Sequence, residues 1–164
     1  MIYIGIDNGV KSGALVALGQ CGSFIEAITM PHNKHRSRNE VNVRAVHKWI
    51  SDITNGNLSN AEYVIEEPNN SRTPSTAYSV ASSFHSLRGF FDTKFLPFER
   101  ITPQSWQKAM LGKVPAGKTK EYALAKAREL WPDEMFYASL RCKTPHQGIV
   151  DAALISEYQR RKTL

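Results

Sequence analysis

The sequence has few cysteines and no long apolar run, and these two shortages exclude several classes of protein. Its 164 residues include only Cys21 and Cys142, which are too few for a disulfide framework and lack the spacing of a zinc site. No apolar stretch approaches the roughly 18 to 20 residues that a membrane span needs. The N-terminus also lacks the basic region of a signal peptide. We therefore expect a cytoplasmic protein with no membrane partner.

Acidic residues are in the minority, and the resulting charge narrows the choice of partner. The chain has 15 Asp and Glu against 21 Lys and Arg, a formal net charge of +6, and its pI is about 9.4. This balance favours a polyanionic partner, and a solvated basic surface explains it equally well. The basic residues gather in two segments, which are His32, Lys34, His35, Arg36, Arg38 and Arg44, and then Lys108, Lys113, Lys118, Lys120, Lys126 and Arg128.

The hydrophobic pattern predicts three strands followed by alternating helices and strands. Short apolar runs typical of buried strands occupy residues 3–6, 14–18, 24–28, 63–66 and 93–98. Helical periodicity begins at residue 41, stops at Asn55-Gly56, and recurs over residues 76–91, 103–110, 120–130 and 149–160. Thr102 is the expected cap of the 103–110 helix. The basic stretch 31–39 is expected to be mobile, and residues 133–147 mostly irregular.

This order of elements predicts an α/β fold in one domain that spans residues 1–164. Closely spaced strands with Gly-containing turns favour an antiparallel arrangement of the first three strands. The alternation that follows favours a five-stranded mixed sheet flanked by helices. In such a fold the first and fourth strands are neighbours, and the last helix packs across them.

Three carboxylates lie on elements that this fold brings together. Asp7 ends the first strand, Glu66 ends the fourth, and Asp151 lies in the expected first turn of the last helix. Unpaired carboxylates at close range repel one another, and Mg²⁺ or Mn²⁺, which prefer hard oxygen ligands, relieve that repulsion. Two such ions about 3.5 to 4 Å apart can activate water and stabilise the leaving oxygen of a phosphodiester. Each residue alone has a structural explanation, so this prediction depends on the set.

Several segments resemble the RuvC family of Holliday-junction resolvases, in the RNase H-like superfamily. Ile4-Gly5-Ile6-Asp7-Asn8-Gly9 is similar to the family's first-strand motif, and Val64-Ile65-Glu66-Glu67 to its second motif. His146-Gln147-Gly148-Ile149-Val150-Asp151-Ala152-Ala153-Leu154 is similar to its last motif. Ile101-Thr102-Pro103-Gln104-Ser105-Trp106, with Lys118-Thr119-Lys120 after it, resembles the phage branch. The likeness extends over nearly the whole chain, and its specificity lies in the order and spacing of the motifs.

The resemblance implies an RNase H-like fold and a set of metal ligands. Asp7, Glu66 and Asp151 match ligands of two Mg²⁺ ions, for which Mn²⁺ substitutes. The family also has an acidic or His ligand a few residues before the last Asp. The acid is missing here, which leaves His146 as the candidate and Glu67 as a weaker one. An ordinary loop histidine explains His146 equally well.

The resemblance also implies contacts with branched DNA. Lys118 or Lys120 matches a basic residue that contacts the scissile phosphate, although either also suits a solvated helix start. Asn69 stands where the bacterial enzymes have an aromatic wedge, so junction opening differs or uses another residue. The predicted nucleic-acid contacts are Lys34, Arg36, Arg38, Lys113, Lys118 and Lys120. A homodimer is implied as well, because a two-fold protein matches a four-way junction, with Phe84, Leu87 and Phe91 as an interface unless they are core.

The predicted function is therefore Mg²⁺-dependent endonucleolytic cleavage of four-way and other branched DNA, in a bacterial cell or a phage-infected host. Hydrolysis is expected to leave 5′-phosphate and 3′-hydroxyl ends. Two alternatives stay open, which are an RNase H-like nuclease acting on other nucleic acids and a protein that binds branched DNA without cutting it.

Two rival motifs are weaker. Residues 112–119 satisfy the G-x-x-x-x-G-K-T pattern of a P-loop, but the residues before them are expected to form a helix, whereas a P-loop needs a strand there. Gly5 to Gly9, followed by Ser12-Gly13, also resembles the first phosphate loop of actin-like kinases. That class needs two such domains, and the length of this chain argues against it.

Overall fold

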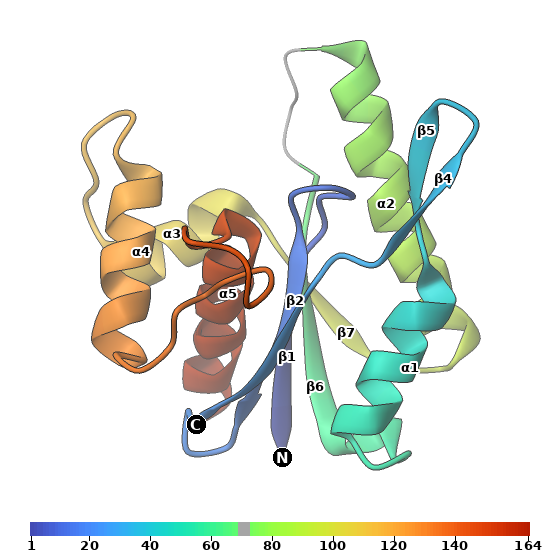
Figure 1. The fold of residues 1–164 in the computed structure, drawn as a ribbon. Coiled ribbons are helices and arrows are strands. Elements are labelled where there is room, and N and C mark those ends of the chain that lie inside the picture. Colours follow the sequence, from blue (N-terminus) through green and yellow to red (C-terminus); the bar gives the residue numbers. More distant parts are fainter. Residues whose placement is uncertain (69–72) are drawn as a thin grey trace.

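A central five-stranded sheet organises the computed structural model, which describes residues 1–68 and 73–164. The strand order is β3-β2-β1-β6-β7 (Figure 1). The elements are β1 (Ile2–Asp7), β2 (Ala14–Gly19), β3 (Phe24–Thr29), β6 (Ala61–Glu66) and β7 (Phe98–Ile101). The first three strands are antiparallel, β6 is parallel to β1, and β7 is parallel to β6. The predicted α/β fold with a five-stranded mixed sheet is confirmed.

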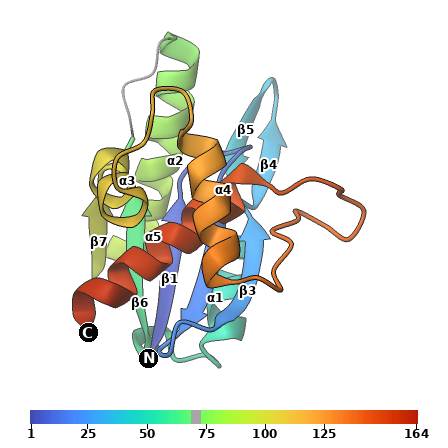
Figure 2. The same ribbon diagram turned by 90° about the vertical axis from the view of Figure 1, so that its left-hand side faces the viewer.

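Helices cover both faces of the sheet (Figures 1 and 2). The helices α3 (Pro103–Leu111), α4 (Thr119–Leu130) and α5 (Gln147–Thr163) lie on one face, and α1 (Val43–Ile53) and α2 (Pro74–Thr93) on the other. A short 3₁₀ helix, η1 (Leu58–Asn60), precedes β6. Because the sheet is covered on both sides, β2 is apolar along its length: Ala14, Val16 and Leu18 pack in one core, and Leu15 and Ala17 in the other.

Helix α5 lies directly against β1, and two glycines allow this approach. A Cβ at Gly5 would lie 2.3 Å from the carbonyl oxygen of Ala152, and one at Gly148 would lie 2.0 Å from that of Ser12. The Ser156 hydroxyl also donates a 2.8 Å hydrogen bond to the Tyr3 carbonyl. These contacts fix the first half of α5 against the end of β1 and the loop that follows it.

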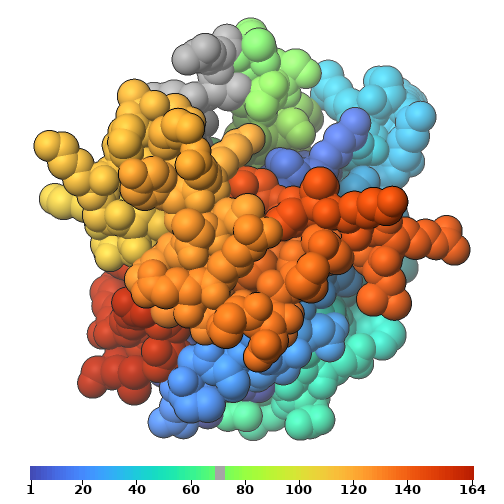
Figure 3. Space-filling model, turned by 60° about the vertical axis from the view of Figure 1, so that its left-hand side comes forward, coloured from blue at the N-terminus to red at the C-terminus, as the bar shows by residue number. Residues whose placement is uncertain are grey.

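The irregular segment after α4 is mostly exposed, and two buried aromatic residues, Trp131 and Phe136, anchor it to the core. Phe24 on β3 makes edge contacts with Trp131 and Phe136, with ring centroids 5.9 Å apart in both pairs. Figure 3 shows this segment, in orange, lying over the blue strands. The expectation that residues 133–147 are mostly irregular is therefore confirmed, since α5 begins only at Gln147.

Three local predictions were wrong. The basic stretch, for which no strand was predicted, forms a hairpin of β4 (His32–His35) and β5 (Arg38–Val41), whose mostly exposed, polar strands carry no apolar alternation to reveal them. Residues 93–98 are not a strand, because α2 continues to Thr93 and β7 begins at Phe98; the apolar Leu96 between them is buried in the core. Asp151 lies in the second turn of α5, because the helix starts two residues earlier than expected.

The apolar stripe on α2 belongs to the core, which is one of the two interpretations left open for it. Phe84, Leu87 and Phe91 are at most 3% exposed, and they pack with β1 and β6 in the core. Their stripe faces the sheet, so it offers nothing to a second copy. No helix in the described part of the chain is both long and apolar enough to cross a membrane.

Candidate active site

The three predicted carboxylates come together where two neighbouring strands end and α5 begins. Asp7 closes β1 and Glu66 closes β6, and the parallel register pairs Ile6 with Ile65, so both acids lie at the same edge of the sheet. Asp151 reaches this edge from α5. We refer to Asp7, Glu66 and Asp151 as the carboxylate site.

Electrostatic repulsion and burial act together on these acids. Burial raises the pKa of Asp7 well above its usual value, and the charges of Glu66 and Asp151 raise it further. Burial also raises the pKa of Glu66 to about 7 and that of Asp151 to about 6. Among the described residues, no basic side chain forms an ion pair with any of the three. The site therefore holds negative charge that the fold itself leaves largely uncompensated.

Neutral donors orient two of the acids. The Trp106 indole N–H donates to Oε1 of Glu66 at 2.7 Å, and the Gln147 amide donates to Oδ1 of Asp151 at 2.8 Å. The Asn8 side chain also donates to the Glu66 main-chain carbonyl at 2.5 Å. Sequence reasoning assigned none of these residues to the site. The signal was available for Gln147, which lies one helical turn before Asp151, but Trp106 lies on a different element and only the fold brings it close.

In the described part of the chain, neither candidate for a fourth ligand forms a hydrogen bond or ion pair with the carboxylate site. His146 is the N-cap residue of α5 but makes no side-chain capping bond, and no described residue hydrogen-bonds its buried Nδ1. Burial lowers the pKa of the ring, which favours the neutral form that binds metals. Glu67 is instead paired with Arg100 at 2.8 Å. Its carboxylate is thus already neutralised, and His146 is the better candidate.

The donor chemistry fits a hard divalent cation, although the acids do not yet surround one point. Three carboxylates whose pKa values are raised chiefly by burial, and which form no ion pair with a basic side chain of the described residues, are the ligand type that Mg²⁺ and Mn²⁺ prefer. Within residues 1–68 and 73–164, however, no group of three His, Cys, Asp or Glu side chains is arranged to hold a metal ion. One oxygen each of Glu66 and Asp151 is held by Trp106 and Gln147, which leaves the other oxygen of each carboxylate without that bond.

The predicted basic contacts lie on two exposed segments on either side of this edge. Lys34, Arg36 and Arg38 are exposed on the hairpin β4–β5, with Arg36 in its turn at a φ of 53°. Lys113, Lys118 and Lys120 are exposed in the α3–α4 loop and at the start of α4.

The two lysines at the start of α4 differ in their surroundings. Lys118 is paired with Glu121 on its own helix at 2.7 Å. The charge of Lys120, by contrast, acts on Asp151 and lowers its pKa. Lys120 is therefore the one coupled electrostatically to the carboxylate site in this conformation.

The elements around residues 112–118 exclude a P-loop. Residues 112–118 connect α3 to α4, so a helix stands where a P-loop needs a buried strand. Asn69, which takes the place of the family's aromatic wedge, lies outside the described residues.

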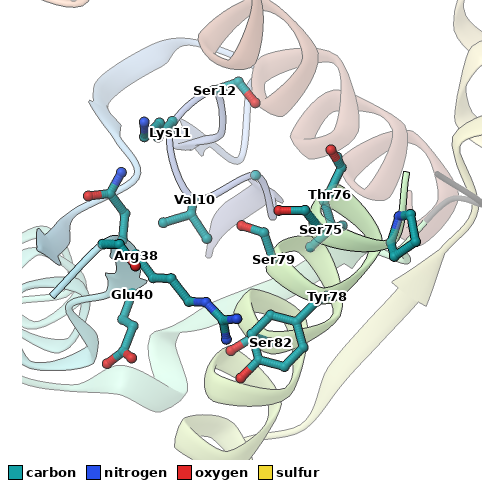
Figure 4. A pocket seen from close by; sticks show the side chains of 15 residues that line it. Val10, Lys11, Ser12, Arg38, Glu40, Ser75, Thr76, Tyr78, Ser79 and Ser82 are labelled. Atoms are coloured by element: carbon teal, nitrogen blue, oxygen red, sulfur yellow. The ribbon is translucent and has the colours of Figure 1, made fainter. Parts of the chain in front are cut away.

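A cleft of about 720 Å³ opens beside the β1–β2 loop, and no motif predicted it (Figure 4). Its walls are the β1–β2 loop from Gly9 to Ser12, the hairpin from Ser37 to Glu40, and the first half of α2 from Pro74 to Ser82. The loop links the cleft to the carboxylate site, because the Gly9 amide donates to Oδ1 of Asp7 at 3.3 Å.

Comparison with known proteins identifies the fold. No family model matches the chain, and no curated protein matches its sequence. A structure of Thermus thermophilus RuvC in complex with a Holliday junction substrate matches with a TM-score of 0.62 and 19% identity, over 99% of this chain and 97% of that one. A second Thermus thermophilus RuvC structure matches with a TM-score of 0.54 and 16% identity, over the same shares of the two chains. The chain therefore has a RuvC-like fold. At identities this low, the likeness does not support the predicted phage-type branch.

Proposed function

We propose that this protein is a divalent-metal-dependent endonuclease that cleaves four-way and other branched DNA. The observation that carries the proposal is the carboxylate site, in which acids from β1, β6 and α5 share one edge of the sheet and none forms an ion pair with a basic side chain of the described residues. Burial raises the pKa of all three, and the charges of Glu66 and Asp151 raise that of Asp7 further. Such an arrangement is unfavourable in the protein alone, and bound metal ions remove the penalty. The RuvC-like fold supports the choice of a branched substrate.

Asp7, Glu66 and Asp151 would hold the ions, with His146 as the proposed fourth ligand. Bound divalent ions supply activation of water and stabilisation of the departing 3′-oxygen. The chain's own residues orient the ligands: Trp106 holds Glu66, and Gln147 holds Asp151. We propose Lys118 as the contact to the scissile phosphate, since its pairing with Glu121 is exposed and readily exchanged.

The basic hairpin and the α3–α4 loop would bind the arms of the substrate through Lys34, Arg36, Arg38, Lys113, Lys118 and Lys120. We propose that the active form is a homodimer, because a four-way junction presents two equivalent strands. Its interface is not the Phe84 stripe, which is buried. The phage-type assignment also belongs to this proposal, supported by the segment from Ile101 to Trp106.

Cleavage of an immobile four-way junction, compared with a linear duplex of the same sequence, tests the proposal. We expect paired nicks in the junction only, in Mg²⁺ or Mn²⁺ and not in EDTA. Asp7→Asn should abolish cleavage and retain junction binding. Asp52→Asn is the matched control, because Asp52 is exposed on α1 and paired with Lys48 at 2.6 Å.

Two other outcomes would point to the alternatives. Equal cleavage of junction and duplex would favour a general RNase H-like nuclease. Tight binding without cleavage in either metal would favour a protein that binds branched DNA, although acids beside phosphates contribute nothing to binding alone.

A further inference from the structure

The cleft beside the β1–β2 loop has the composition of a nucleic-acid subsite rather than of an apolar ligand pocket. Its walls carry many hydroxyl groups, including Ser12, Ser75, Thr76, Ser79 and Ser82. The walls also carry two basic side chains, Lys11 and Arg38, and one acid, Glu40. Hydroxyl and basic groups are donors suited to the sugar-phosphate backbone.

An aromatic side chain stands in this polar wall. Tyr78 on α2 is 58% exposed, which is unusual for so large a ring. The Arg38 guanidinium reaches from the hairpin and lies 4.7 Å from the centre of the ring (Figure 4). This cation–π contact holds the ring in place, and the exposure of Tyr78 leaves ring surface open to solvent.

We propose that this cleft binds an unpaired stretch of DNA, with one base stacked on Tyr78 and Arg38 on the neighbouring phosphate. A cavity of about 720 Å³ lies within the roughly 300 to 1,000 Å³ range of small-ligand pockets, a size that suits a short unpaired segment. Stacking on an exposed aromatic ring beside basic groups is the usual way in which proteins hold single strands. The inference rests on the proposed function in that it takes DNA as the substrate.

The position of the cleft ties this subsite to the carboxylate site. The loop that forms one wall also contacts both catalytic elements, because Gly9 donates to Asp7 and the Ser12 carbonyl lies against Gly148 at the start of α5. A strand held in the cleft would therefore contact the loop that hydrogen-bonds Asp7. The cleft explains how nucleotides near the cleavage point are kept unpaired.

The test is the affinity for fluorescein-labelled oligothymidine and for a duplex of equal length, measured by anisotropy in EDTA. We expect Tyr78→Ala to weaken single-strand binding about tenfold and to leave duplex binding unchanged, whereas Tyr78→Phe keeps the wild-type affinity. Arg38→Ala should weaken binding and reduce its salt dependence. Tyr122→Ala is the matched control, since Tyr122 is an exposed tyrosine (40%) on α4, outside the cleft.

A second measurement locates the bound strand directly. An oligothymidine containing 5-iodouracil, cross-linked by light and mapped by mass spectrometry, should label peptides from α2 or the hairpin β4–β5. Single-strand binding by Tyr78→Ala as tight as that of the wild type, cross-links elsewhere, or no binding of oligothymidine by the wild type would each overturn the proposal.

Failure of this proposal and failure of the proposed function give different results. If the wild type cleaves the junction and Tyr78→Ala binds single strands normally, only the cleft assignment fails. If binding depends on Tyr78 but neither Mg²⁺ nor Mn²⁺ supports cleavage, the nuclease assignment fails and the cleft stands.

Discussion

Two carboxylates on the same helix meet opposite environments. Glu157, in the second half of α5, has a side chain only 3% exposed and accepts hydrogen bonds from Arg160 and Arg161 at 2.6 to 2.9 Å. These arginines lower its pKa in spite of its burial. Asp151, two turns earlier, has only the neutral Gln147 as a hydrogen-bond partner among the described residues, and its pKa rises to about 6.

The difference separates a structural acid from a candidate functional one. A buried acid with cationic partners, such as Glu157, stabilises the fold. One without them, beside two further acids, reduces stability until something else supplies positive charge. Burial alone therefore does not mark the site, since Glu157 is the more buried of the two; the missing partner does.

Exchanging each acid for its amide should give opposite phenotypes. Asp151→Asn should lower the junction cleavage rate by at least about a hundredfold, because a proposed metal ligand is lost, while stability stays equal or increases. Glu157→Gln should leave cleavage nearly intact and lower the free energy of unfolding by about 3 kcal/mol, because two arginines lose their partner. Cleavage assays and urea unfolding of both variants check this. A stable, fully active Asp151→Asn would remove Asp151 from the site.

The stability of the metal-free protein should fall as pH rises. Glu66 and Asp151 have folded-state pKa values of about 7 and 6, above their ordinary values. Between about pH 4 and 7 the folded state therefore holds more protons than the unfolded state, and stability decreases with pH through this window, by about 1.4 kcal/mol for each unit by which a pKa is raised. Glu157 acts in the other direction: its pKa is lowered, so its contribution is present above its ordinary pKa and is lost as pH falls through the folded value.

Urea unfolding in EDTA from pH 5 to pH 8 measures this slope. Mg²⁺ should restore stability at pH 8 and have little effect at pH 5, where the site is protonated. Glu66→Gln should flatten the slope, and Glu157→Gln should leave it in place above pH 5. A wild-type slope of the opposite sign, or no effect of Mg²⁺ at pH 8, would contradict the assignment of an uncompensated site.

Trp106 offers a smaller change at the same site. Trp106→Phe keeps an aromatic ring in the core but removes the N–H that holds Glu66, so the apparent affinity for Mn²⁺ should fall about tenfold. Trp49→Phe is a close control, because the Trp49 indole also donates to a glutamate, Glu26, at 2.8 Å, away from the site. Calorimetric titration with Mn²⁺, which needs no cleavage, measures both. Equal affinities in the two variants would mean that Trp106 only fills space.

Apolar periodicity carries most of the information about the fold. The runs at β1, β2 and β6 could be predicted because strands covered on both faces are continuously apolar, and the edge strand β3 because it keeps several apolar residues although Ile25 and Glu26 are exposed. The hairpin β4–β5 could not, since its strands are mostly exposed and polar. The fifth strand was placed too early because Leu96, a core residue in a turn, resembles a strand residue.

The site was predictable where its residues end elements, and not where tertiary contacts define it. Asp7 and Glu66 could be paired from strand order alone, and the register confirms that they share an edge. Trp106 and Tyr78 carried no such signal: one looks like core, and the other like a helix-surface residue. Only the packing of α3 on the sheet, and of the hairpin on α2, brings them to the site and the cleft.

The two lysines at the start of α4 should have the smallest effects on cleavage. Lys120 supplies part of the positive charge that Asp151 lacks, since its charge lowers the pKa of that acid. Lys120→Ala should therefore shift the acidic limb of the pH–rate profile of cleavage to higher pH by a few tenths of a pH unit. The reason is that Asp151 then loses its proton at higher pH. Lys118→Ala should lower the rate about threefold without moving the profile, because Lys118 is paired with Glu121 and not with Asp151. If Lys118→Ala moves the profile and Lys120→Ala does not, the pairing with Glu121 breaks in the working enzyme and Lys118 takes over the role of compensating Asp151.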